Sequence, residues 1–508
     1  MDVEISAYEY FLKGVAGHKS CLSFFGREFS GEETVRRIGG MAEFLREKGV
    51  TRGSVVAINL PNIPECIFTI YAVNALGAVA FVTHPLLPAE ALAASVREAG
   101  ASLLICLSSL AEDMGVPKVI CDGISFLPPV KKFFAKFRAQ KEGAGARYPY
   151  DRLSAREILP AGQADDVAFY LPSGGTTGEP KIIRVTNRAF NENAEATLSL
   201  AKLDLTPYSV LLALPFFHGF GLSSSLHGAV SGGARGVILP FFAPKRIAKY
   251  VRKGEVNIIL GVPNMYRKLL AEKDFRKGIK HMCLAFSGGD TLPAKVKREY
   301  DALAAAAGSP TRLYQGYGLA ETVSVCVANS LGEDKIGTIG KPVNAEVKIL
   351  REDGAECDAG EIGEIAVSTP CMMKGYLGQE DFSDEYLLTG DLGYLDEDGY
   401  IVFSGRKKRI IVIGGMNVYP LEIERAAMEL SFVKEAAAVE YREKGKPKIA
   451  LFISDISEEN DKIKTEKILM HLRRRLIRYA LPTKIRYLDA LPLTDLGKID
   501  VKALKEGV

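Results

Sequence analysis

The stretch VAFYLPSGGTTGEPK, residues 167–181, says most about the fold, because a short apolar run leads directly into a loop rich in glycine. The apolar run predicts a buried strand. The glycines allow the backbone to turn sharply and to point successive N–H groups into one concavity. The hydroxyl groups and the terminal lysine supply further donors and a positive charge. We therefore predict a polyphosphate cradle formed by Ser173, Gly174, Gly175, Thr176, Thr177, Gly178 and Lys181.

This loop differs from a Walker loop. In the Walker pattern a lysine directly follows the second glycine, whereas Glu179 and Pro180 follow Gly178 here. The competing interpretation is a surface turn that is merely rich in glycine. The density of hydroxyl groups argues for the cradle.

Outward from this loop, short apolar runs alternate with helical patterns over the first 300 residues. This alternation is typical of parallel sheets that helices cover on both faces. Beyond about residue 335 the strands become shorter and are separated by turns, which indicates a β-rich part. The predicted strands are 54–60, 77–83, 101–107, 209–215, 235–241, 257–263, 281–289, 347–350, 364–369 and 399–405, with helices at 64–75 and about 88–99. The predicted fold class is α/β.

Composition narrows the class of protein. The chain has 508 residues, of which 47% are hydrophobic and 25% charged, and its net charge is +3. These values exclude a disordered or fibrous protein and predict no general affinity for nucleic acid. No apolar run reaches the roughly 20 residues of a membrane span. The acidic start argues against a secretory signal, and eight scattered cysteines without a C-x-x-C pair fit a reducing cytoplasm and no Cys/His metal site.

The charge balance changes near residue 405. Residues 405–508 contain 22 Lys and Arg against 15 Asp and Glu, a surplus of seven, so the remainder carries a net charge of −4. We therefore predict a large domain, 1–404, and a small basic α+β domain, 405–508. A basic domain suits a phosphate-rich or acidic partner. The alternative is an accident of surface composition.

Residues 130–141, VKKFFAKFRAQK, place Val130, Phe133, Phe134 and Phe137 on one helical stripe among lysines and an arginine. Such a helix could lie on an anionic membrane. It could equally pack against its own domain.

Six further motifs follow the predicted cradle along the chain. They are LPFFHGFG (214–221), SGGD (287–290), YQGYGLAET (314–322), TGDLGYLDEDGY (389–400), GRKKRIIVIGGMNVYPLEIE (405–424) and LPLTDLGKID (491–500). Together with SGGTTGEPK, they resemble the motifs of the AMP-forming adenylating superfamily, which contains acyl-CoA synthetases, adenylation domains of peptide synthetases and luciferases. The resemblance extends from about residue 30 to the C-terminus.

The resemblance implies a reaction and a role for each matching residue. A carboxylic acid would attack the α-phosphate of ATP and form an acyl-adenylate, with Mg²⁺ held by Glu321 and the meeting anions bridged by the catalytic Lys498. His218 would lie where the acyl pocket meets the thiol tunnel. The adenine and ribose would be bound by Gly288, Gly289, Asp290, Gln315, Gly316, Tyr317, Asp391 and Arg406.

The resemblance also implies a second step. The small domain would act as a mobile lid that turns about a hinge at Lys408, and Gly414 and Gly415 would let the pantetheine of CoA pass. The acyl pocket would include Phe217, Phe220, Met265 and Val323. It has no evident acid for an ammonium group, so a hydrophobic acid is favoured over an amino acid, with a weak preference for a medium- or long-chain fatty acid.

Several alternatives remain open. The enzyme could be an aryl-acid CoA ligase, a ligase that loads an acyl carrier protein, an amino-acid adenylating enzyme or a non-catalytic nucleotide-binding protein. Ala320 occurs where most relatives have threonine, and some enzymes that load carrier proteins share this YGLAE pattern. Asp290, Gly174 and Arg409 also depart from the usual residues, but none of these changes removes the predicted Mg²⁺ ligand or the catalytic lysine.

Overall fold

The computed structural model describes residues 1–107, 114–121, 125–127, 146–147, 154, 158–173, 181–413, 416–443, 445–457, 459–493 and 499–508. The segment 130–141, with its predicted membrane contact, lies outside the described residues. Within them, no helix is both long and apolar enough to cross a membrane.

The first layer of the large domain is an eight-stranded sheet. Its strands run parallel from β8 to β7, and β9 and β19 join in antiparallel fashion. In spatial order they are β19 (Gly375–Tyr376), β9 (Ile182–Thr186), β8 (Val167–Pro172), β4 (Val79–Val82), β3 (Val55–Asn59), β5 (Leu103–Leu107), β6 (Lys118–Cys121) and β7 (Ala146–Arg147).

The second layer is a nine-stranded sheet that is parallel from β14 to β1 and antiparallel at both ends. Its strands in spatial order are β16 (Lys341–Pro342), β15 (Val325–Ala328), β14 (Leu313–Gly318), β13 (Leu284–Ser287), β12 (Ile258–Gly261), β10 (Ser209–Leu212), β11 (Arg235–Ile238), β1 (Leu22–Phe24) and β2 (Arg27–Phe29).

Helices connect and cover these sheets, and the largest apolar cluster joins both sheets through residues of α3, α6 and η1. Several helices begin with proline, whose missing N–H is not needed in the first turn. The helices of the large domain are α1 (Ala7–Val15), α2 (Gly31–Glu47), α3 (Pro64–Ala75), α4 (Ala89–Glu98), α6 (Asn187–Ala201), η1 (Phe220–Gly228), α7 (Ala229–Ser231), α8 (Pro244–Arg252), α9 (Pro263–Leu270), α10 (Lys273–Gly278), η2 (Ile279–His281) and α11 (Ala294–Ala306).

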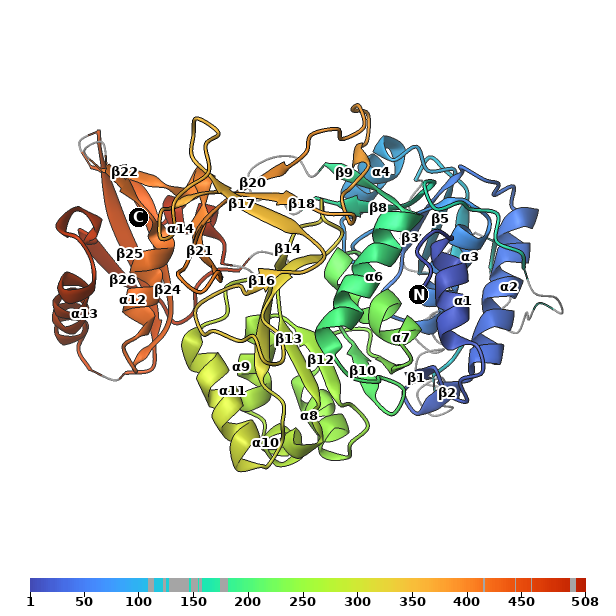
Figure 1. Cartoon of the computed structure of the whole chain (residues 1–508), viewed down its shortest axis with the longest axis horizontal. Coiled ribbons are helices and arrows are strands. Elements are labelled where there is room, and N and C mark those ends of the chain that lie inside the picture. Colours follow the sequence, from blue (N-terminus) through green and yellow to red (C-terminus); the bar gives the residue numbers. More distant parts are fainter. Residues whose placement is uncertain are drawn as a thin grey trace.

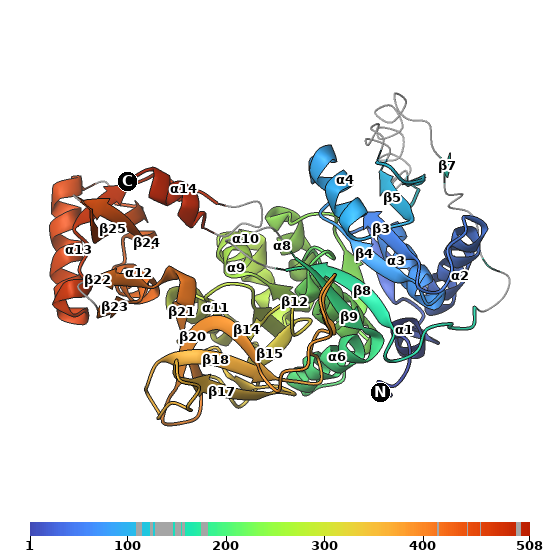
Figure 2. The same cartoon turned by 90° about the horizontal axis from the view of Figure 1, so that it is seen from above.

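A third sheet, which is antiparallel, adjoins the small domain. The small domain forms a separate lobe at the left of Figure 1, and the view from above in Figure 2 shows the same lobe. The third sheet contains β17 (Glu346–Leu350), β18 (Gly363–Ser368), β20 (Leu387–Leu395) and β21 (Ile401–Arg406). The small domain contains β22 (Ile411–Ile413), β23 (Met416–Val418), α12 (Pro420–Met428), β24 (Val433–Glu443), β25 (Lys446–Asp455), α13 (Asp461–Arg475), η4 (Arg478–Ala480), β26 (Lys484–Tyr487) and α14 (Val501–Glu506).

The predicted α/β class is confirmed. The apolar runs of the first 300 residues form parallel neighbours in the two large sheets, and the short strands beyond residue 335 form the antiparallel third sheet. Strand β21 runs two residues past the predicted domain boundary, because residues 405 and 406 pair with β20. The short helix η3 (Lys407–Arg409) follows it.

A buried histidine joins three elements of the core. His227 lies on η1, and its Nε2 is 3.0 Å from Asn191 Oδ1, while its Nδ1 is 3.0 Å from the hydroxyl of Tyr71. An amide oxygen only accepts, so Nε2 donates to it and Nδ1 accepts from the tyrosine. Burial lowers the pKa of His227 to about 3, because the charged imidazolium loses its hydration.

Because of His227, we expect the folded protein to lose stability in acid. The unfolded chain binds a proton at His227 below pH 6.5, while the folded protein resists it down to about pH 3. Folding should therefore lose up to about 1.4 kcal/mol per pH unit from this group as pH falls through that interval. Denaturant unfolding of the wild type and His227→Gln between pH 4 and 7 measures this, and we expect a shallower slope in the variant. Parallel slopes would contradict the assignment.

Candidate active site

The ends of the predicted phosphate loop are held together at the point where β8 ends and β9 begins. The N–H of Ser173 donates to the carbonyl of Lys181 over 2.8 Å, and the N–H of Lys181 donates to Ser173 Oγ over 2.9 Å. The loop must therefore leave and re-enter the sheet at one place. Its central residues Gly174, Gly175, Thr176, Thr177 and Gly178 lie outside the described residues.

One tyrosine connects this loop to the predicted Mg²⁺ ligand. The Lys181 ammonium lies 4.6 Å from the ring centre of Tyr376, and the Tyr376 hydroxyl donates to Glu321 Oε1 over 3.0 Å. Strand β19 brings Tyr376 there, because it pairs with β9 beside the loop. Burial and the neighbouring Glu321 carboxylate raise the pKa of Tyr376, so the hydroxyl remains a donor.

The predicted adenine side is formed at the ends of two adjacent parallel strands. Gly288 and Gly289 follow β13, and Gln315, Gly316 and Tyr317 lie on β14. A Cβ on Gly288 would lie 3.2 Å from the ring of Phe220, and Gly289 has a φ of +77°. A side chain at Gly288 would therefore crowd the Phe220 ring, and the positive φ at Gly289 favours glycine.

Asp391 joins two sheets at this site. Its side chain is 1% exposed; Oδ2 accepts from the Tyr317 hydroxyl over 2.8 Å, and Oδ1 lies 3.0 Å from Arg406 Nε. Register places Asp391 opposite Arg406 on β20 and β21, whereas Tyr317 comes from the second large sheet. Burial and the adjacent carboxylate raise the pKa of Tyr317. The cluster thus presents a carboxylate, an aromatic face and a guanidinium.

The remaining two predicted binders of adenine and ribose differ in burial. Gln315 is buried, and its backbone carbonyl accepts from Asn329. Asp290 is exposed, and its Oδ1 accepts from the N–H of Thr291 over 2.7 Å. Gln315 and Tyr317 are thus close to each other because both lie on β14. The Asp290 side chain instead hydrogen-bonds to the backbone of the next residue, within its own turn.

The predicted acyl residues gather around η1. The ring of Phe217 lies 4.5 Å from His218 and 4.4 Å from His84, a neighbour that the sequence did not reveal. Val323 has a φ of +63°, which is unusual for a branched side chain. A Cβ on Gly219 would lie 1.7 Å from the carbonyl oxygen of Val323, so only glycine fits beside it.

The side chains of Met265 and Phe220 occupy space next to Gly261 and Gly288, where those glycines carry no side chain. A Cβ on Gly261 would lie 3.3 Å from Met265 Cε, and the ring of Phe220 covers Gly288 in the same way. Gly261 is the last residue of β12, within the stretch 261–266 that the sequence indicates for the acyl pocket. The wall of this region is apolar, with His218 half-buried beside it.

The ion pairs before and after the predicted hinge belong to different domains. Arg406 pairs with Asp391 and Lys407 pairs with Glu364 over 2.8 Å, both in the large domain, whereas Arg409 pairs with Glu424 of α12 over 2.7 Å. Lys408, between these two groups, is exposed.

The small domain also contacts the large one away from the hinge. Arg267 on α9 pairs with Glu435 over 2.7 Å, and Lys295 Nζ donates to the carbonyl of Ser431. Gly414, Gly415 and Lys498 lie outside the described residues. A β-bridge between Leu493 and Ile499 joins the two ends of the segment that contains Lys498.

The comparisons with known proteins bear on this geometry. The model of the AMP-binding enzyme family matches residues 13–377, and that of the AMP-binding enzyme C-terminal domain matches residues 422–498. The chain belongs to the AMP-binding enzyme family. It is 29% identical to the long-chain-fatty-acid–CoA ligase of Bacillus subtilis, over 96% of this chain and 91% of that protein. It is 30% identical to the 2-succinylbenzoate–CoA ligase of Bacillus velezensis, over 90% and 88% of the two chains.

A solved structure shares the fold of this chain. ATP-bound MatB from Rhodopseudomonas palustris is 25% identical to this chain, covers 99% of each chain and superposes with a TM-score of 0.82. Apo MatB superposes with a TM-score of 0.75 over the same coverage.

Within the described residues, no group of three or more His, Cys, Asp or Glu side chains could hold a metal by itself. Glu321 fits Mg²⁺ in another way. A hard cation accepts one carboxylate and completes its shell with phosphate oxygens and water, so a single well-placed glutamate beside the phosphate loop is a suitable donor set.

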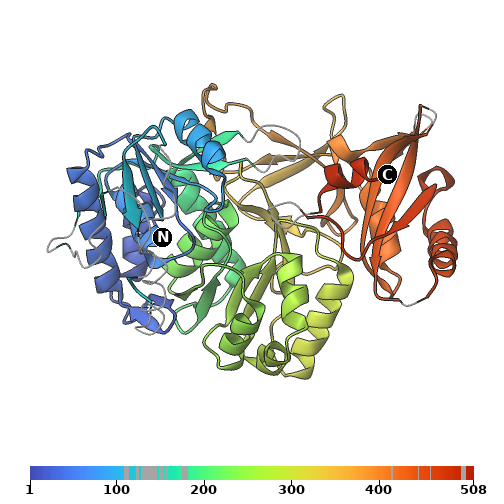
Figure 3. The ribbon, with the colours of Figure 1, turned by 180° about the vertical axis from the view of Figure 1, so that it is seen from behind.

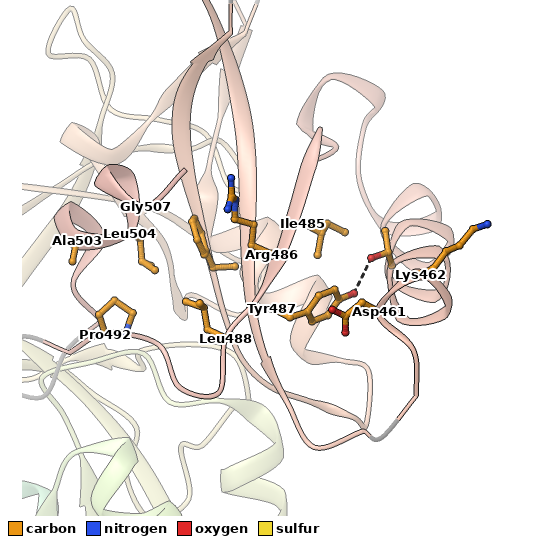
Figure 4. A pocket seen from close by; sticks show the side chains of 12 residues that line it. Asp461, Lys462, Ile485, Arg486, Tyr487, Leu488, Pro492, Ala503, Leu504 and Gly507 are labelled. Atoms are coloured by element: carbon orange, nitrogen blue, oxygen red, sulfur yellow. Dashed lines mark hydrogen bonds between the residues drawn. The ribbon is translucent and has the colours of Figure 1, made fainter.

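A separate hollow of about 630 Å³ lies wholly within the small domain, along the edge strand β26 (Figure 4). Its wall includes Arg486, Tyr487 and Leu488, together with residues of α13 and α14. None of the predicted site residues that the structure describes lines it.

Proposed function

We propose that this enzyme joins a hydrophobic carboxylic acid to CoA in two steps, using ATP and releasing AMP and pyrophosphate. The observation that carries the proposal is Asp391, a buried carboxylate held between Tyr317 and Arg406 at the strand ends. A nucleoside needs this combination, since the aromatic face stacks on the base while the carboxylate accepts from ribose hydroxyls. The CoA-ligase names of its relatives support the same reaction.

In the first step, a carboxylate oxygen of the acid attacks the α-phosphorus of ATP, and the bond to the bridging oxygen of pyrophosphate breaks. Lys181 and the loop N–H groups hold the departing phosphates, and Lys498 bridges the carboxylate and the α-phosphate. Mg²⁺, when bound at Glu321, would neutralise phosphate charge. Positioning and charge stabilisation supply most of the catalysis in such a transfer.

In the second step, the thiolate of CoA attacks the acyl carbon and AMP leaves. We propose that the lid turns at Lys408, with the domain boundary at residues 407–409. The ion pairs support this, because those of Arg406 and Lys407 stay within the large domain and that of Arg409 stays within the lid. Rotation at Lys408 would then break none of them.

The acid is proposed to be a fatty or an aryl acid, because the pocket region is apolar and the relatives include ligases for both. An acyl carrier protein as acceptor remains the second candidate, favoured by Ala320 and the basic lid. The use of ATP and CoA fits the cytoplasm. The decisive experiment incubates the protein with ATP, Mg²⁺, CoA and a pool of acids, followed by mass spectrometry. Acyl-CoA together with AMP supports the proposal, whereas acyl-AMP alone would indicate carrier loading.

Tyr376 provides a prediction about Mg²⁺. Tyr376→Phe removes the hydroxyl that donates to Glu321 but keeps the ring beneath Lys181. Because groups that orient a metal ligand typically contribute 10- to 100-fold in metal affinity, we expect half-maximal activity to need about tenfold more Mg²⁺. Tyr376→Leu should also weaken ATP binding, since the ring contact with Lys181 is lost. ATP–pyrophosphate exchange across a Mg²⁺ titration measures both effects.

The matched control is Tyr441→Phe, which removes a hydroxyl that contacts Thr483 in the lid. It should leave the Mg²⁺ titration unchanged. If the Mg²⁺ titration of Tyr376→Phe is also unchanged, Tyr376 has no role at the proposed Mg²⁺ site.

A further inference from the structure

Positive charge is concentrated in one part of the large domain, outside the residues proposed to bind ATP. Residues 241–280 contain 11 Lys and Arg but only three Asp and Glu. This surplus of eight exceeds the net charge of +3 for the whole chain and the surplus of seven in the small domain. This segment contains α8, α9 and α10, with the buried strand β12 between α8 and α9.

The three helices contact one another. On α8, Ile247, Ala248 and Val251 face the core, and the helix has no acidic residue. A Cβ on Gly278 of α10 would lie 2.5 Å from the backbone of Arg252, so glycine lets α10 touch α8 directly. Figure 1 places α8 and α10 at the lower corner of the large domain, and the view from behind in Figure 3 shows the same yellow-green corner.

Much of this charge has no partner within the protein. Arg252 pairs with Asp274, Lys253 with Glu255, and Arg276 with Glu299. Among the described residues, six exposed lysines of this surface make no ion pair or hydrogen bond, namely Lys245, Lys249, Lys268, Lys273, Lys277 and Lys280. We call these six lysines, together with Phe241, the α8–α10 surface.

Lysines gathered on neighbouring helices repel one another, and an anionic partner offsets this repulsion. Lysine is a hydrated point charge without the bidentate fork of arginine, so such a face suits a diffuse anionic field. Phe241, directly before α8, is 69% exposed. Basic helices flanked by an exposed aromatic ring are typical of proteins that rest on lipid headgroups.

We propose that the α8–α10 surface binds the anionic phospholipids of a bilayer, with Phe241 inserted among the headgroups. Helix α9, which contributes Lys268 to this surface, also carries Met265 of the acyl region, so the docked enzyme has its acyl site close to a source of amphiphilic acid.

The test is co-sedimentation of the full chain with vesicles of phosphatidylcholine alone or with 30% phosphatidylglycerol. We expect binding to the anionic vesicles only, and weaker binding at higher salt. Each lysine near such a surface contributes about fivefold in affinity, so Lys245→Gln/Lys249→Gln/Lys277→Gln should lower it on the order of 100-fold. Phe241→Ala should lower it further at high salt, where the charges are screened.

The matched control is Lys462→Gln/Arg473→Gln/Arg474→Gln, which removes three exposed cations from α13 in the lid. It should bind the anionic vesicles as the wild type does. Equal binding to neutral vesicles, unchanged binding of the lysine variant, or an equal loss in the control would overturn the proposal. So would a lysine variant that loses affinity for duplex DNA or an acidic protein but keeps its vesicle binding.

The binding assay does not depend on enzyme activity, so it remains informative if the proposed reaction is wrong. Circular dichroism of the lysine variant establishes that it is folded. Its ATP–pyrophosphate exchange with a water-soluble acid should match the wild type, because none of the three lysines belongs to the catalytic site.

Discussion

Replacing Asp391 by alanine should lower kcat/KM for ATP in the adenylation step by about 10²- to 10³-fold. The carboxylate is buried and accepts from Tyr317 while pairing with Arg406, so its removal takes away the proposed ribose acceptor and releases both neighbours. Charged hydrogen bonds contribute about 1.5–3 kcal/mol each, and misplacement of the nucleotide adds to that loss. ATP–pyrophosphate exchange over a range of ATP concentrations measures the effect.

Two controls separate binding from folding in this experiment. Asp398→Ala removes a carboxylate from an exposed turn of the same segment and should leave kcat/KM unchanged. Tyr317→Phe keeps the aromatic face and removes only the hydroxyl, so its effect should be smaller than that of Asp391→Ala. A variant of Asp391 that melts like the wild type and keeps its kcat/KM would exclude the ribose role.

Replacing Lys498 by alanine should lower adenylation by about 10³-fold while leaving thioester formation from supplied acyl-adenylate near the wild-type rate. In the first step two anions meet, and a lysine that bridges the carboxylate and α-phosphate oxygens offsets their repulsion. Loss of one such preorganised donor typically costs 10²- to 10³-fold. In the second step the phosphate is already joined to the acyl group, so this need disappears.

The two half-reactions must be measured separately, by pyrophosphate release from ATP and by acyl-CoA formation from synthetic acyl-AMP. Lys502→Ala, an exposed lysine at the start of α14, is the matched control and should affect neither. An equal loss in both half-reactions for Lys498→Ala would show that the lysine serves the general structure of the lid rather than adenylation.

Local patterns in the sequence determined much of the architecture. The run from Pro64 to Ala75 forms a helix with those bounds, and the apolar runs at 54–60 and 77–83 form neighbouring parallel strands. Their periodicity and their proline and glycine boundaries act over a few residues, so they can be read without knowledge of the fold. The motif order likewise identified the family, which the family models confirmed over residues 13–377 and 422–498.

Contacts between distant segments were decided only by the tertiary structure. Tyr376 belongs to no quoted motif, yet sheet pairing places it between Lys181 and Glu321, which are far apart in the sequence. Asp391 was predicted as a ribose ligand, but its bonds to Tyr317 and Arg406 depend on how the second and third sheets meet.

The α8–α10 surface shows the same division. The excess of lysine and arginine between residues 241 and 280 can be counted from the sequence, and so can the amphipathic pattern of α8. Only the fold sets α10 against α8 at Gly278 and leaves six lysines unpaired among the described residues. Sequence patterns determine which face of each element is buried, because that depends on neighbours a few residues away; packing decides which faces meet, because it depends on the whole chain.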